Sequence, residues 1–211
     1  MGAAIAGVVT SGGNSVQVLT NDPQKASAAI PTATHAKVGE PITGDIVILA
    51  LPYGAIAGVL SQYAGELDGK AVVDITNPLN FATFDSLVVP VGTSAAELIA
   101  ETLPGSSVLK AFNTNFAATL ASGTVGAETT TVLIAGNDAD AKAALAAVIE
   151  AGGLRAVDAG SLKRGPRARS PRLPPTDPRS RRENVLDERL RAGQIGTHDE
   201  AQEPSLLRCT N

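Results

Sequence analysis

Cysteine, tryptophan and long hydrophobic runs are what this sequence of 211 residues has least of. The single cysteine, Cys209, excludes an intrachain disulfide framework and a cysteine metal site. No apolar run approaches the ~18–20 residues that span a bilayer, and no basic region followed by an apolar one opens the chain. We therefore expect a cytoplasmic protein without a membrane partner. Hydrophobic residues make up 44% of the chain and charged residues 18%, a balance typical of globular proteins.

Charge and proline divide the chain near Leu162. Residues 1–162 hold 6 Lys and Arg against 14 Asp and Glu, whereas residues 163–211 hold 11 against 7, with 6 of the 13 prolines. The second segment has few large apolar residues, so it cannot bury enough surface to offset the chain entropy lost on folding. We predict an ordered domain over 1–164 and an Arg/Pro-rich disordered tail over 165–211. The tail lacks interleaved aromatic residues and any nucleic-acid-binding motif, so we expect no nucleic-acid partner.

Strands and helices alternate along the predicted domain. Strands are predicted over 16–19, 46–51, 71–75, 108–111, 131–135 and 154–157, and helices over 2–11, 54–63, 94–103 and 139–150. Near-continuous apolar runs such as 46–51 are typical of parallel strands buried on both faces. The alternation predicts an α/β fold with a doubly wound parallel sheet. Because such sheets bind ligands at the carboxyl ends of their strands, the residues that follow each strand are the candidate site.

Five short segments, in order, resemble the family of NADP-dependent oxidoreductases that includes the NADPH:coenzyme F-420 reductases. Coenzyme F-420, written F420 below, is an 8-hydroxy-5-deazaflavin. The segments are LALPYGA at 49–55, VDITNPLN at 73–80, GTSAAE at 92–97, VLKAFNT at 108–114 and VDAGSL at 157–162. The resemblance implies a Rossmann-like domain that binds NADP(H) and exchanges a hydride with F420 or a small substrate. It also implies a homodimer, since C-terminal helices often pair in this family.

The two ends of the chain depart from the family pattern. Family members open with a buried strand and a G-x-G-x-x-G turn, of which Gly2 corresponds to the third glycine. The turn binds the pyrophosphate through backbone N–H groups and the helix dipole. We expect a reading frame that begins upstream of Met1, and a sheet that lacks its central first strand and is therefore poorly stable. The Arg/Pro-rich tail is either an acquired segment or an out-of-frame extension.

Three residues around the end of the strand at 16–19 are candidates for the adenosine side of the cofactor. NAD-binding domains usually place Asp or Glu at this strand end, where the carboxylate binds the ribose hydroxyls. Here the hydroxyl of Thr20 and the cation of Lys25 favour a 2′-phosphate, and hence NADP. The family often has arginine where Asn21 stands, so NAD remains an alternative, as does a solvated loop that binds nothing. Asp22 is sufficiently explained as a helix N-cap before Pro23.

The strand at 46–51 ends in Leu51, and the following Pro52 and Tyr53 are expected to pack along the ribose and pyrophosphate. The alternative is structural: Pro52 ends the strand and Tyr53 covers the core. Neither His35 nor His198 has the spacing of a metal site or a catalytic triad, so no metal is expected.

Two asparagines are candidates for positioning the reacting rings. Asn77 follows the strand at 71–75, where its amide can bond the nicotinamide carboxamide or ribose, while Pro78 fixes the loop. The alternative is an ordinary Asn-Pro turn. Asn113 stands where some family members carry histidine, and an amide there can donate a hydrogen bond but cannot act as an acid or base. Asp74, within the strand, is expected to be a structural carboxylate.

The function predicted from the sequence is hydride transfer between NADP(H) and a second redox cofactor or small substrate. Two alternatives stay open at this stage. One is a dinucleotide-binding sensor without catalysis, and the other is a truncated fragment without activity.

Overall fold

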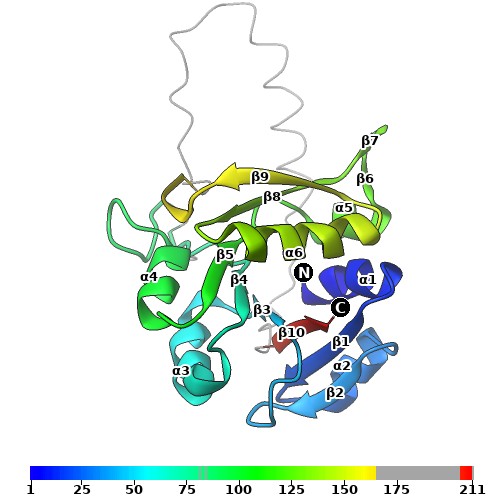
Figure 1. Ribbon diagram of the computed structural model, residues 1–211, viewed down its shortest axis with the longest axis horizontal. Coiled ribbons are helices and arrows are strands. Elements are labelled where there is room, and N and C mark those ends of the chain that lie inside the picture. Colours follow the sequence, from blue (N-terminus) through cyan, green and yellow to red (C-terminus); the bar gives the residue numbers. More distant parts are fainter. Residues whose placement is uncertain (81, 84, 165–204, 211) are drawn as a thin grey trace, which may run out of the picture. The chain divides into compact units, whose positions relative to one another are not determined.

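A computed structural model describes residues 1–80, 82–83, 85–164 and 205–210 of the chain (Figure 1). The helices are α1 (Gly2–Ser11), α2 (Pro23–Ala29), α3 (Tyr53–Tyr63), α4 (Ala95–Thr102), α5 (Ala117–Ser122) and α6 (Ala139–Ala151), with 3-10 turns at Ala64–Glu66 and Leu162–Arg164. The strands are β1 (Ser15–Thr20), β2 (Thr34–Lys37), β3 (Ile46–Ala50), β4 (Ala71–Asp74), β5 (Ser107–Lys110), β6 (Thr124–Val125), β7 (Glu128–Thr129), β8 (Thr131–Gly136), β9 (Arg155–Gly160) and β10 (Ser205–Thr210).

Eight strands form one sheet in the order β2-β1-β10-β3-β4-β5-β8-β9. The pairs β1/β2, β3/β4, β4/β5 and β8/β9 are parallel, which confirms the predicted α/β fold with a mainly parallel sheet. The sequence did not predict that β8 would pair antiparallel with β5, a contact limited to Leu109 with Gly136 and Lys110 with Ala135. The short hairpin of β6 and β7 and the strand β2 were also not predicted.

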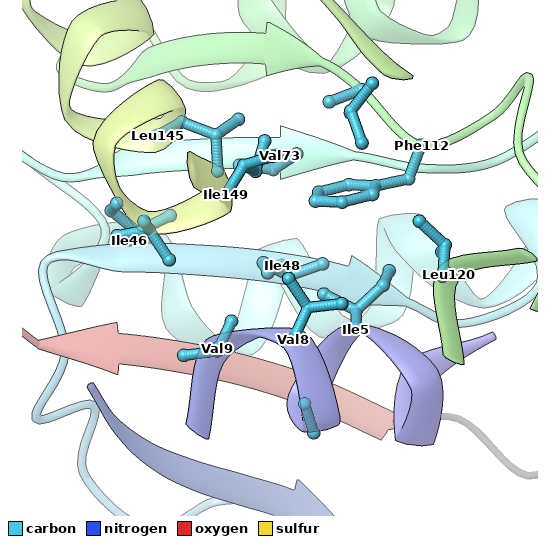
Figure 2. Close-up of a cluster of buried hydrophobic side chains, with 14 of the residues drawn as sticks. Ile5, Val8, Val9, Ile46, Ile48, Val73, Phe112, Leu120, Leu145 and Ile149 are labelled. Carbon is cyan, nitrogen blue, oxygen red and sulfur yellow. The ribbon is translucent and has the colours of Figure 1, made fainter. Parts of the chain in front are cut away.

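Helices cover both faces of the sheet, as the buried runs require. Ile46 and Ile48 of β3 belong to a core that α1 and α6 complete, and Figure 2 shows Ile5, Val8 and Ile149 directed into it. The alternate β3 residues, Val47 and Leu49, pack on the opposite face, in a core that includes Ile56 of α3 and Ile99 of α4. Successive side chains of a strand point to opposite faces, so a continuous apolar run requires cover on both.

The central position of the sheet is occupied. β10 lies between β1 and β3 and is antiparallel to both, so that Ser205 is level with Thr20 and Ala50. The sequence predicted a gap at this position, with two unpaired strand edges; in the structure β10 pairs with both edges. Ser205–Thr210 form a strand that the sequence did not predict. The rest of the predicted tail, 165–204 and 211, lies outside the described residues.

Side-chain caps fix the starts of three helices. Asp22 accepts the Lys25 N–H at α2 and Ser94 accepts the Glu97 N–H at α4, which confirms the predicted Asp22 cap. At α6, Asp138 accepts hydrogen bonds from the Ala141 N–H and the Ser107 hydroxyl, and both lower the pKa of its carboxyl. Within the described residues, no helix is both long and apolar enough to cross a bilayer.

Candidate functional site

The carboxyl ends of β3, β4 and β5 lie level with one another. The register pairs Leu49 with Asp74 and Asp74 with Lys110, so the segments after these strands start from one edge of the sheet. All of the predicted site residues except Gly2, Thr20, Asn21 and Lys25 follow β3, β4 or β5. We refer to this edge as the carboxyl edge.

A buried ion pair joins β4 to β5 at the carboxyl edge. Lys110 Nζ lies 2.8 Å from Asp74 Oδ2 and also donates a hydrogen bond to the Thr76 carbonyl oxygen. Asp74 Oδ1 accepts hydrogen bonds from the Thr76 N–H and hydroxyl, both at 2.8 Å. The Asp74 side chain has no exposed surface and that of Lys110 is 9% exposed. Asp74 therefore has the surroundings of the structural carboxylate that the sequence predicted.

Asn77 and Asn113, in the segments that follow β4 and β5, contact each other. Asn77 Nδ2 donates a hydrogen bond of 3.0 Å to the Asn113 carbonyl oxygen, and Asn113 Nδ2 lies 3.5 Å from Asn77 Oδ1. Asn77 is exposed and Asn113 is partly exposed. The structure thus brings together the two predicted positioning residues, and each amide keeps hydrogen-bonding capacity for a ligand.

Tight turns bend the chain at both asparagines. The Leu79 N–H donates to the Asn77 carbonyl across Pro78, and the Asn113 N–H donates to the Ala111 carbonyl across Phe112, each at 2.8 Å. These are three-residue γ-turns. Phe112 has φ 61°, a left-handed conformation that costs a residue with a side chain about 1–2 kcal/mol. Its ring, 1% exposed, packs in the core near Leu120 and Val73 (Figure 2), so burial of the ring holds this conformation.

Thr20, Asn21 and Lys25 lie at the end of β1. The Thr20 hydroxyl is buried and accepts the Asp22 N–H at 3.3 Å, whereas Asn21 and Lys25 are exposed. No carboxylate stands at the strand end, and that of Asp22 is engaged as the α2 cap. Four strand spacings, about 19 Å in total, separate β1 from β5, so one ligand that touches Lys25 and Asn113 must be elongated.

Between these two ends lie the residues that follow β3. Leu51 is buried in the core, Pro52 is exposed at the N-cap position of α3, and Tyr53 is partly buried against the same core. Pro52 has φ −59° and the Ala55 N–H bonds to its carbonyl oxygen, so proline fixes the start of the helix. Of these three residues, only Pro52 is exposed to solvent. Leu51 and much of Tyr53 pack in the core, as the structural alternative predicted for Tyr53.

Gly2 lies in the first turn of α1, which ends only three residues before β1 begins. The C-terminus of α1 therefore lies near the start of β1. Because a helix of ten residues is about 15 Å long, the N-terminus of α1 reaches back to the carboxyl edge. Met1 provides no side-chain cap, and no acidic residue stands in the first turn. The positive end of the α1 dipole is therefore directed to the same edge as Asn77 and Asn113.

The sequence of this domain matches a family model described as NADP oxidoreductase, coenzyme F420-dependent, over residues 1–78. The match covers 78 of the 211 residues, from α1 to the loop that follows β4. The F420-dependent NADP reductase of Methanocaldococcus jannaschii is 34% identical over 125 residues, which are 57% of this chain and 56% of that protein. The chain thus matches a little more than half the length of this relative.

Solved structures support the family's fold over more of the chain. A hypothetical protein from Sinorhizobium meliloti has a TM-score of 0.71 and 29% identity, over 81% of this chain and 85% of that one. A protein from Arthrobacter sp. FB24, provisionally described as an F420-dependent NADP reductase, has a TM-score of 0.67 and 25% identity, over 92% of this chain and 90% of its own. These similarities support the family resemblance carried by the five sequence segments.

Lys110 and Thr76 are the residues of the site that sequence reasoning missed. Both lie in segments that carry the family resemblance. Thr76 fell in the candidate loop after the strand at 71–75 but was given no role, and Lys110 was not a candidate. A signal was present: a lysine that ends a buried strand, Val108-Leu109-Lys110, needs a partner, and Asp74 ends the preceding strand. Among the described residues, no cluster of three or more His, Cys, Asp or Glu could hold a metal ion.

Proposed function

We propose that this chain holds NADP(H) along the carboxyl edge and orients its nicotinamide for hydride exchange with F420 or a small substrate. The observation that carries the proposal is the contact between Asn77 and Asn113, at the strand ends of a Rossmann-like sheet in a chain that matches this family over residues 1–78. NADP(H), when bound, supplies the hydride chemistry. The contribution of the chain is to bind and orient, the role to which amide side chains are suited.

The residues at the carboxyl edge fit the groups of NADP(H) in order along the sheet. The exposed Lys25, with no acid at the β1 end, suits a 2′-phosphate. The uncapped start of α1, with Gly2 in its first turn, suits a diphosphate. Asn77 and Asn113 offer donors and acceptors in the pattern that a carboxamide requires. Support for F420 as acceptor comes from the family and from the name of the M. jannaschii relative.

The direct test is oxidation of NADPH by the purified full chain, followed as loss of NADPH absorbance when oxidised F420 is supplied. We expect Asn77→Asp to lower kcat/KM about tenfold, because it removes the amide donor and leaves one hydrogen bond unmade. Asn80→Asp is the matched control: it makes the same change in the same loop, and the acceptor that binds the Ala82 N–H is retained. Micromolar binding of NADPH without turnover would instead indicate the sensor alternative, and no binding would contradict the proposal.

A second prediction concerns the choice between NADP and NAD. Lys25→Glu is expected to weaken NADP⁺ binding about tenfold and to leave NAD⁺ binding unchanged, because it places a negative charge where the 2′-phosphate would lie. The measurement is the Kd of each nucleotide by calorimetry. Lys163→Glu is the control, because it makes the same charge change at an exposed residue far from Lys25. Lys163 follows β9, and β9 and β2 are the two opposite edge strands of the sheet. Equal losses for both nucleotides would show that Lys25 does not select the phosphate.

The sequence-based expectations of a cytoplasmic location and a homodimer belong to this proposal as well. Gel filtration of the purified chain at micromolar concentration distinguishes a dimer from a monomer.

A further inference from the structure

We propose that Asp74 and Lys110 are positioning residues, whose buried ion pair sets the geometry of the Asn77–Asn113 amide pair. The inference rests on the proposed function only where it concerns a bound nucleotide. The geometry of the amide pair itself is a property of the protein alone.

The ion pair lies at the ends of β4 and β5, beneath the protein surface. Both side chains are buried, with 0% and 9% of their surface exposed, so neither is available to touch a ligand. Lysine and aspartate are almost never fully buried unless they are paired. Here the bonds of both partners converge on one residue outside the strands, Thr76.

Hydrogen bonds from the ion pair hold Thr76 in place. Its N–H and hydroxyl donate to Asp74 Oδ1, and its carbonyl oxygen accepts a bond from Lys110 Nζ. Three polar atoms of one residue are thus bound by the ion pair, which leaves Thr76 little freedom to rotate. Asn77 is the next residue in the chain, so the direction of its side chain depends on this anchor.

The ion pair is also close in sequence to Asn113. Lys110 is the last residue of β5, and only Ala111 and Phe112 separate it from Asn113. The γ-turn at Phe112 reverses the chain so that the Asn113 carbonyl oxygen faces Asn77 Nδ2. The ion pair therefore fixes both segments relative to each other: Thr76 directly, and the end of β5 through the backbone of Lys110.

A double variant separates this positioning role from a role in stability alone. Asp74→Leu with Lys110→Met removes both charges with side chains of similar size, a replacement that often preserves folding. It also removes every side-chain bond that holds Thr76. If the ion pair only stabilises the fold, a folded double variant should show the same side-chain amide mobility at Asn77 and Asn113 as wild type.

The first readout uses no ligand. Side-chain amide resonances of Asn77 and Asn113, identified by the spectra of Asn77→Asp and Asn113→Asp, report the mobility of each amide in the intact chain. We expect restricted amides in wild type and order parameters below about 0.6, typical of flexible groups, in the folded double variant. Unchanged amide mobility would overturn the inference. If the double variant does not fold, Thr76→Val, which removes one hydroxyl bond, takes its place with the same expected direction.

The second readout compares NADP⁺ with 2′-phospho-ADP-ribose, which lacks the nicotinamide. The double variant is expected to bind NADP⁺ about tenfold more weakly than wild type and the shortened nucleotide equally well. Equal losses for both nucleotides would contradict a role directed at the ring. If wild type binds neither nucleotide, the proposed function fails, while the amide mobilities still decide whether Asp74 and Lys110 position the asparagines.

Discussion

Replacing Lys110 by methionine is expected to lower the free energy of unfolding by about 3–5 kcal/mol, because the substitution leaves the carboxylate of Asp74 buried without its cation. The Thr76 carbonyl loses its partner at the same time. Domains of ordinary stability unfold with about 5–15 kcal/mol, so this loss consumes a large part of the total. Urea titration followed by circular dichroism measures it.

The control for this prediction is the same substitution combined with Asp74→Leu. Removing both charges avoids an unpaired buried ion, so the double variant should recover most of the lost stability. A Lys110→Met protein as stable as wild type would show that the ion pair is not formed in solution. A double variant less stable than the single one would show that the hydrogen bonds to Thr76, rather than the ion pairing, dominate the energy.

The second large effect is expected at the centre of the sheet. Leu207→Pro places a residue without an N–H in β10, between Val18 of β1 and Ile48 of β3. It removes a ladder hydrogen bond to one neighbouring strand and leaves that strand's carbonyl unpaired. We expect a loss of about 2–4 kcal/mol and faster hydrogen exchange in both β1 and β3.

Leu207→Val is the matched control, since valine keeps the backbone N–H and suits a strand. It should leave exchange in β1 and β3 close to that of wild type. If Leu207→Pro were as stable as wild type, with unchanged exchange at Val18 and Ile48, the pairing of β10 with these strands would be wrong.

Local patterns in the sequence were sufficient to predict the elements whose hydrophobic periodicity or capping residues are visible in a short segment. The apolar run that became β3 and the Asp22-Pro23 start of α2 needed no information from distant residues. The contact of Asn77 with Asn113 was predictable in part, because the ends of neighbouring parallel strands meet at one edge. Their roles toward a cofactor stay predictions.

Other features depended on pairing between distant residues, which local sequence does not specify. Leu206 and Leu207 are the only adjacent leucines of the tail, but Arg and Pro around them made the whole segment read as disordered. The left-handed conformation of Phe112 is likewise invisible in the sequence, since phenylalanine disfavours it and only burial of the ring imposes it.

The position of β10 has a consequence for the order of events during synthesis. β10 comes long after β1 and β3 in the chain, yet it pairs with both of them. Until it emerges, both nascent strands must keep backbone groups open to solvent or to other chains. Contacts so far apart in sequence also slow folding, because a long loop must close first. A cell making this protein would therefore need chaperone protection for the growing chain until β10 has been synthesised.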